Sequence, residues 1–373
     1  MTEIGIGIIG GGYMGKAHAV AMAAVGTSFN TKLRPRLEMI AATSETSAER
    51  YRAAYGFARS TDDWRMLVAD PKVDAVIIAS PPSTHRDIAL AAFANGKHVF
   101  CEKPLGASFK EGADMVAAAA KARPLVNMVG FNYIRTPAAQ FIRNLLNKGD
   151  IGEITYFRAE MNEDFMALAE DEWTWRSEGE SNGALGDLAP HGINLSLALM
   201  GSIKRLNGEV QTLYETRPYQ GSMRKVTNDD RGQFICEFES GTRGHFSFSR
   251  CALGRKMGYV FEIFGTKGSI RFDQEDQNAI WLYRHEGNNA EMGFKKILTN
   301  PSHPDYVNFN LGPGHGTGYQ DQIIIEARDF LKAIETGEEI WPTFLDAQEV
   351  NKIIHALRLS NDRGAWVTLS ELS

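Results

Sequence analysis

Residues 4–15 read IGIGIIGGGYMG, and six of these twelve residues are glycine. The β-branched run that opens the stretch predicts a strand, and the Ala-rich residues that follow it have helical spacing. Gly10, Gly12 and Gly15 therefore occupy a strand-to-helix turn, the context that the dinucleotide fingerprint GxGxxG requires. The first glycine permits a tight turn, the second lets backbone approach a pyrophosphate, and the third lets helix and strand pack closely. The stretch predicts nucleotide binding at a helix N-terminus, against the alternative of a glycine-rich turn without a ligand.

The rest of the first third alternates between strand and helix patterns. Further strands are expected at Leu37–Thr43, Val73–Ser80, Lys97–Glu102 and Leu125–Gly130. Helices are expected at Ser47–Tyr55, Ile88–Asn95 and Phe109–Ala122, with Ser47 as an N-cap. This alternation predicts an α/β Rossmann domain with a doubly wound parallel sheet over residues 1–125.

The pattern changes after residue 130. Helices are expected at Pro137–Asn147, Gly183–Leu199, Gln320–Glu335 and Asp346–Leu359. Strands are expected at Gln233–Glu239, Arg243–Arg250, Tyr259–Gly265, Ser269–Asp273 and Ile280–Tyr283. Turn pairs such as Ser240-Gly241 and Lys267-Gly268 indicate antiparallel pairing. Residues 126–373 are therefore predicted to form an α+β domain with a largely antiparallel open sheet, and the helix near residues 346–360 is a candidate to pack back onto the first domain.

Composition narrows the class of protein. The 373 residues carry a net charge of −6, which disfavours a nucleic-acid-binding surface. No apolar run approaches the roughly 18 residues of a membrane span, and the N-terminus does not resemble a signal peptide. Cys101, Cys236 and Cys251 stand far apart, and the histidines lack a ligand spacing. We expect a cytoplasmic protein with no metal site and no membrane partner.

The end of the second strand bears on the choice of cofactor. An acidic residue normally follows the fingerprint there, but residues 26–36 look like an inserted loop and no Asp stands at the strand's end. Glu45 would bind ribose hydroxyls and favour NAD, whereas Ser44 with Arg50 would hold a 2′-phosphate and favour NADP. A third reading places Glu45 merely in the first turn of a helix, where an acid is stabilising. We expect NAD, with NADP as the alternative.

Two further segments carry candidate catalytic groups. Lys103, within Glu102-Lys103-Pro104, follows a predicted strand, and open α/β sheets bind ligands outside such strand ends. Asp187 and His191 are four residues apart and would share one helix face. Histidine suits general-base work near neutral pH, and an acid one turn away can orient it or engage substrate. The alternative for Lys103 is an ordinary solvated lysine at the end of a strand. The alternative for the other two residues is that Asp187 only begins a helix and His191 packs against its neighbours.

Trp173-Thr-Trp175-Arg176 comes shortly before that helix. Two tryptophans flanking an arginine suit a sugar or polyol site, because rings cover C–H faces and the guanidinium donates hydrogen bonds to oxygens. Core packing of the two rings is the alternative reading.

Together these motifs resemble the Gfo/Idh/MocA family of oxidoreductases, over nearly the whole chain. The resemblance is carried by GIGIIGGGYMGKAHA at 5–19, SPPSTH at 80–85, GKHVFCEKPL at 96–105, GALGDLAPHGIN at 183–194 and GPGHGTGYQDQIIIEARDFLKAI at 312–334. Within the family the chain is most similar to polyol and sugar dehydrogenases that act on inositols, pyranoses or anhydrosugars.

The resemblance implies roles for particular residues. His191 matches the family's general base, Asp187 the acid that works with it, and Lys103 the lysine that contacts substrate and poises proton transfer. The cofactor is expected against Gly10, Gly12, Tyr13, Met14, Gly15, Ser44, Glu45, Ser80, Pro81, Pro82, His85, Glu102 and Lys103. Substrate contacts are expected from Lys103, Asn132, Trp175, Arg176, Asp187, His191 and His315.

The implied activity is NAD(P)-dependent hydride transfer between nicotinamide and a secondary hydroxyl of a cyclic polyol or sugar. Three alternatives remain open: an NADPH-dependent reductase, a non-catalytic nucleotide-sensing regulator, and a glycosidase that uses NAD without net redox. Relatives commonly form dimers or tetramers through the second domain's sheet, so a homotetramer or homodimer is expected. Phe and Ile residues in those strands would fill the core on one face and meet a partner on the other; they are Phe234, Ile235, Phe238, Phe246, Phe248, Phe261, Ile263 and Phe264.

Overall fold

The alternating strands and helices of the first third build a six-stranded parallel sheet. In this computed structural model, which describes residues 2–372, the strand order is β3-β2-β1-β4-β5-β6. The strands are β1 (Thr2–Ile9), β2 (Leu33–Ala41), β3 (Arg59–Thr61), β4 (Ala75–Ile78), β5 (His98–Glu102) and β6 (Asn127–Gly130). The central strands β1 and β4 are buried on both faces. Because Ile9 pairs with Ile78, the glycine turn lies level with Ala79 at the point where the strand order reverses.

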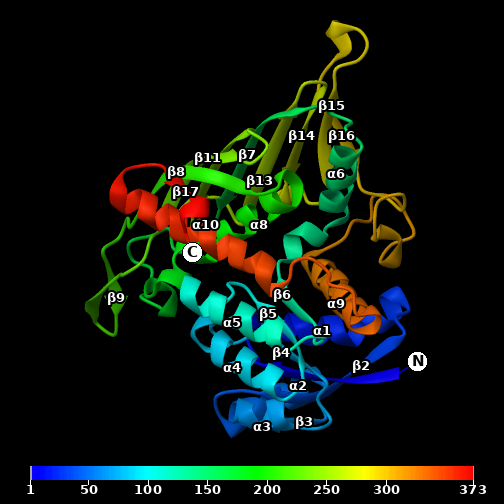
Figure 1. Cartoon of the computed structure of the whole chain (residues 1–373), viewed down its shortest axis with the longest axis vertical. Helices are drawn as coiled ribbons and strands as arrows, with labels where there is room; N and C mark the ends of the chain where they lie inside the picture. The colour runs from blue at the N-terminus through cyan, green and yellow to red at the C-terminus, as the bar shows by residue number, and fades with distance from the viewer. Residues whose placement is uncertain (1, 373) are drawn as a thin grey trace. The chain divides into compact units, whose positions relative to one another are not determined.

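Helices cover both faces of this sheet (Figure 1). They are α1 (Tyr13–Phe29), α2 (Glu45–Tyr55), α3 (Trp64–Ala69), α4 (Pro82–Ala94), α5 (Phe109–Lys121), the 3-10 turn Asn132–Arg135 and α9 (Tyr319–Thr336). Helix α1 packs against α2 and α9, whereas α4 packs against α3 and α5. The doubly wound Rossmann fold is confirmed, with α9 as a late addition to it.

The division of the chain differs from a single cut at residue 125. One compact unit runs to Arg135 and resumes from Gly318 to Asn351, and the other comprises Thr136–Thr317 and the residues from Lys352 onward. The long helix α10 (Phe344–Arg363) contributes residues to both units.

The second unit contains a nine-stranded sheet in the order β16-β15-β14-β13-β7-β12-β11-β8-β17. Its strands are β7 (Ile154–Asn162), β8 (Ile203–Gln211), β11 (Arg231–Phe238), β12 (Arg243–Ser249), β13 (Gly258–Gly265), β14 (Gly268–Asp273), β15 (Ala279–Arg284), β16 (Lys295–Leu298) and β17 (Val367–Thr368). Only β7 and β12 pair in parallel, so the largely antiparallel open sheet is confirmed. A separate hairpin joins β9 (Thr216–Tyr219) to β10 (Ser222–Lys225), and the unit's helices include α6 (Pro137–Asn147), α7 (Ala184–Asp187) and α8 (Ala189–Met200).

Three local expectations were wrong. Residues 26–36 do not form an inserted loop, because α1 continues to Phe29 and β2 begins at Leu33. The N-cap of α2 is Ser44 rather than Ser47, since the Ser44 side chain accepts the Ser47 backbone N–H at 3.3 Å. The expected helix Gly183–Leu199 is divided at Leu188 into α7 and α8.

The two faces of the large sheet differ in chemistry. Six of the eight Phe and Ile residues named above are buried core residues, whereas Ile235 is 47% exposed and Phe264 half-buried. The face that carries Ile235 and Phe264 also carries cross-strand ion pairs, such as Arg158–Glu262 at 2.6 Å and Arg205–Glu237 at 2.7 Å. Of these eight residues, only Ile235 and Phe264 lie on the face opposite the core, and the contact of that face with a partner stays a prediction.

Candidate functional site

The glycine turn after β1 has the form that a dinucleotide needs. Gly10 has φ +101°, and a Cβ on Gly15 would lie 1.9 Å from the Gly10 carbonyl oxygen. These two positions therefore require glycine for the fold itself. A Cβ on Gly12 would meet no atom within 4 Å, so its side faces open space at the N-terminus of α1. This open side fits a pyrophosphate, which would bind at the helix N-terminus.

Aromatic side chains surround the start of α1. Tyr13 is 74% exposed and stacks on Tyr319 at 6.0 Å between ring centroids. The Tyr319 hydroxyl contacts the Met14 sulfur at 3.6 Å, and its ring lies 6.1 Å from that of Tyr133. Burial raises the pKa of Tyr319, so its hydroxyl stays protonated. The sequence did not single out Tyr319 and Tyr133, because they are distant along the chain from the fingerprint.

The residues that follow β2 bear on the choice between NAD and NADP as cofactor. The Ser44 hydroxyl accepts the N-cap hydrogen bond of α2, and the Arg50 guanidinium lies 4.8 Å from the Tyr51 ring centroid. Glu45, the first residue of α2, is exposed. An exposed carboxylate at this position is the arrangement that binds ribose hydroxyls in dinucleotide sites.

Hydrogen bonds from a buried histidine stabilise the loop after β4. Pro81 is the N-cap residue of α4, Pro82 opens the helix, and the Ser80 hydroxyl bonds that of Thr84. His85 is buried, and its two ring nitrogens lie 2.8 Å from the Ser80 carbonyl oxygen and 3.0 Å from that of Pro104. Burial lowers the pKa of His85, although both carbonyls oppose this shift by favouring the protonated ring. These contacts indicate that His85 stabilises the loop. Its direct contact with cofactor stays a prediction.

Glu102, at the end of β5, points into the fold. Its Oε1 lies 2.7 Å from Nε2 of His18, a buried residue of α1 that the sequence analysis missed. Lys103 follows it and is half-buried. Asn132 is also buried, and its amide donates to Gln322 Oε1 at 2.9 Å. The predicted ribose contact of Glu102 and substrate contact of Asn132 remain predictions.

In the second unit, Arg176 brings three of the predicted residues together. Its guanidinium forms an ion pair with Asp187 and lies 4.5 Å from the ring of Trp175. The ring of Phe165 lies 5.4 Å from the guanidinium on the same loop, a contact that sequence reasoning missed. Trp175 is 54% exposed and Phe165 40% exposed. The charged pair can donate hydrogen bonds to a ligand and accept them from it, while the accessible rings can cover the C–H groups of that ligand.

Asp187 and His191 lie on consecutive turns across the junction of two helices. Pro190 has no N–H to donate, and the His191 N–H bonds the Leu188 carbonyl at 3.2 Å. His191 is buried, and its own carbonyl accepts the Tyr259 hydroxyl at 3.3 Å. The break places the acid at the end of one helix and the histidine in the first turn of the next.

His315 lies in the loop before α9. It is exposed, and its ring covers Gly312, where a Cβ would come 2.8 Å from the imidazole. Its substrate contact stays a prediction.

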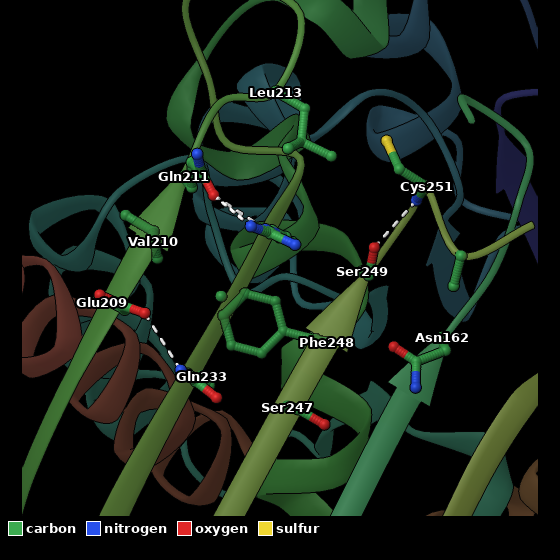
Figure 2. Close-up of a pocket in the computed structure, with 13 residues that line it drawn as sticks. Asn162, Glu209, Val210, Gln211, Leu213, Gln233, Ser247, Phe248, Ser249 and Cys251 are labelled. Carbon is green, nitrogen blue, oxygen red and sulfur yellow. Dashed lines mark hydrogen bonds between the residues drawn. The ribbon is translucent and has the colours of Figure 1, made fainter. Parts of the chain in front are cut away.

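A separate hollow opens over β7, β8, β11 and β12 (Figure 2). It encloses about 430 Å³, and none of the predicted site residues lines it. Its polar side chains bond one another, as in Arg231 to Gln211 at 2.6 Å and Gln233 to Glu209 at 3.1 Å. Because these polar side chains bond one another, we do not assign the reaction to this hollow.

Comparison with known proteins identifies the family. Residues 4–131 match the model of the oxidoreductase family with an NAD-binding Rossmann fold, and residues 139–271 match the GFO/IDH/MocA C-terminal domain. The chain belongs to the Gfo/Idh/MocA family of oxidoreductases. No helix in the described part of this family member has both the length and the apolar character to cross a bilayer.

Individual relatives of this Gfo/Idh/MocA oxidoreductase include sugar and polyol dehydrogenases. Levoglucosan dehydrogenase of Pseudarthrobacter phenanthrenivorans is 36% identical, with both chains fully covered. Myo-inositol 2-dehydrogenase of Thermotoga maritima is 24% identical over 89% of each chain. The solved structure of a levoglucosan dehydrogenase with NADH and L-sorbose matches with a TM-score of 0.96 and 36% identity, covering 99% of each chain.

Proposed function

We propose that this protein is an NAD-dependent dehydrogenase that oxidises a secondary hydroxyl of a cyclic sugar or polyol. The observation that carries the proposal is the Arg176–Asp187 pair beside the exposed rings of Trp175 and Phe165, one turn before His191. Whole-length similarity to levoglucosan dehydrogenase supports an anhydrosugar as the first substrate to test. The open side of Gly12 and the exposed Glu45 support NAD as cofactor.

The roles follow from the chemistry of the side chains. NAD supplies the hydride acceptor when bound, and the alcohol C–H supplies the hydride. His191 takes the hydroxyl proton as general base, so the alcohol becomes a ketone. Lys103 stabilises negative charge on the oxygen, and Asp187 with Arg176 orients the remaining hydroxyls. The unit that contains the glycine turn is assigned to the dinucleotide, and the other unit to the sugar.

A substrate panel tests the proposal. Formation of reduced nicotinamide is followed by absorbance with NAD and then NADP, over anhydrosugars, inositols and aldoses. His191→Asn and Lys103→Met should each lower kcat by at least about 10²-fold, while the Kd for NADH stays within about twofold. His285→Asn is the control, an exposed histidine bonded to Tyr283. Unchanged turnover in either variant would refute the role assigned to the substituted residue. If the wild-type enzyme forms no reduced nicotinamide with either cofactor, the proposed reaction is refuted.

Two further assignments belong to the same proposal. Sparse, unpaired cysteines support a cytoplasmic location. The other assignment is a homo-oligomer, either dimer or tetramer, formed through the nine-stranded sheet, as the family resemblance implies. A monomer in sedimentation velocity would reject the oligomer.

A further inference from the structure

A buried ionic cluster lies outside the predicted site residues. Asp230 is fully buried, and its Oδ1 lies 2.8 Å from Nη2 of Arg250 and 3.9 Å from Nη2 of Arg217, two other buried residues. Its second oxygen accepts the backbone N–H groups of Leu213 at 2.7 Å and Tyr214 at 3.2 Å. Buried charges are tolerated when they are paired and hydrogen-bonded, so this cluster has a defined geometry.

The cluster reaches the segment that carries the candidate site. Arg250 donates from Nη1 to the carbonyl oxygens of Arg176 at 2.7 Å and Asn182 at 3.2 Å. Asn228 accepts from Arg250 at 2.9 Å and donates to the carbonyls of Arg176 and Gly179, each at 3.0 Å. The Arg176 carbonyl therefore receives two hydrogen bonds from buried side chains.

The same cluster holds the rest of this loop. Arg217 donates to the carbonyl oxygens of Met166 at 2.7 Å and Leu168 at 2.8 Å, directly after Phe165. The Asp229 carboxylate accepts the backbone N–H of Leu185 at 2.6 Å, near the start of α7. Both ends of segment 176–187, which presents Arg176 and Asp187, are thus tied to residues 228–230 and Arg250.

We propose that Arg250 and Asn228 are positioning residues, which hold segment 176–187 so that Arg176 and Asp187 can bind the sugar. This inference rests on the proposed function, because it assigns substrate binding to that pair. Neither residue makes the ion pair itself: they act through the backbone carbonyl of Arg176. Arginine suits this role because its rigid fork of donors serves a carboxylate and two carbonyls at once.

Asn228→Ala is the principal test, because it removes the bonds to Arg176 and Gly179 while Arg250 keeps Asp230. Arg250→Lys is the second variant: it keeps the buried charge but lacks the fork. Arg231→Lys is the matched control, since Arg231 neighbours Asp230 in sequence but bonds Gln211 instead. The measurements are kcat and KM for the sugar, the Kd for NADH, and amide hydrogen exchange of peptides covering residues 163–187.

Asn228→Ala should raise KM roughly tenfold, with a smaller change in kcat and an unchanged Kd for NADH. Exchange in residues 163–187 should become faster in both test variants and stay unchanged in the control. A role confined to stability would lower the unfolding temperature and leave KM and local exchange at wild-type values, and that result would overturn the inference. If the wild-type enzyme oxidises no sugar, the proposed function fails, and hydrogen exchange alone then supports or overturns the positioning role.

Discussion

Two of the fingerprint glycines, Gly12 and Gly15, should respond differently to the same added methyl group. Gly12→Ala places its Cβ where no atom lies within 4 Å, on backbone with φ −69° that alanine can adopt. Its folding stability should change by less than about 1 kcal/mol, because alanine restricts the unfolded chain but is a poorer N-cap of α1 than glycine. The methyl group would, however, occupy the open side expected to receive the pyrophosphate. We predict a fall in NADH affinity of at least about tenfold, equivalent to about 1.4 kcal/mol.

Gly15→Ala provides the contrast. Alanine has about 1 kcal/mol better helix propensity than glycine, but the added Cβ would sit 1.9 Å from the Gly10 carbonyl oxygen. Reaching ordinary contact requires a shift of more than about 1 Å between α1 and the turn, and such overpacking costs about 1–3 kcal/mol. The clash should prevail, so Gly15→Ala should unfold at a lower temperature than wild type.

Thermal unfolding without cofactor and a fluorescence titration with NADH measure the two effects separately. Wild-type affinity in Gly12→Ala would show that this turn does not hold the pyrophosphate. A large loss of stability in Gly12→Ala would show that the space above the turn is needed by the fold itself.

Two other predictions concern the same unit. Glu326 is buried in α9, and burial raises the pKa of its carboxyl well above 4.5, so the folded protein keeps a proton that the unfolded chain releases. The stability that Glu326 contributes should therefore fall as pH rises above about 4.5, and the unfolding temperature of Glu326→Gln relative to wild type should be higher at about pH 8 than at about pH 5. An equal difference at both pH values would indicate an ionised Glu326 in the folded protein. Glu45→Ser removes the exposed carboxylate at the end of β2 and should weaken NAD binding while reducing discrimination against NADP. An unchanged ratio of NAD to NADP affinity would remove Glu45 from the ribose site.

Regular elements with a strong local pattern were predictable from the sequence. The helix Pro137–Asn147 has the bounds expected from its periodicity, and the glycine turn lies between a strand and a helix as predicted. Other elements were missed, among them β7, whose outward-facing side chains include the exposed Arg158, paired with Glu262 across the sheet. The predicted loop at residues 26–36 was wrong because α1 continues to Phe29, where Arg34 donates to the Gly26 carbonyl oxygen near the helix end.

Sequence alone determined the fold class, the family resemblance and the chemical character of the candidate site, because these depend on local patterns and on the order of motifs. Tertiary structure decided which side chains became neighbours. The pairing of Arg176 with Asp187, and of His18 with Glu102, joins residues 11 and 84 positions apart. The cluster of Arg217, Asp230 and Arg250 is set by strand pairing and burial. No local pattern encodes such contacts, since the stability of a buried charge depends on partners that only folding brings within reach.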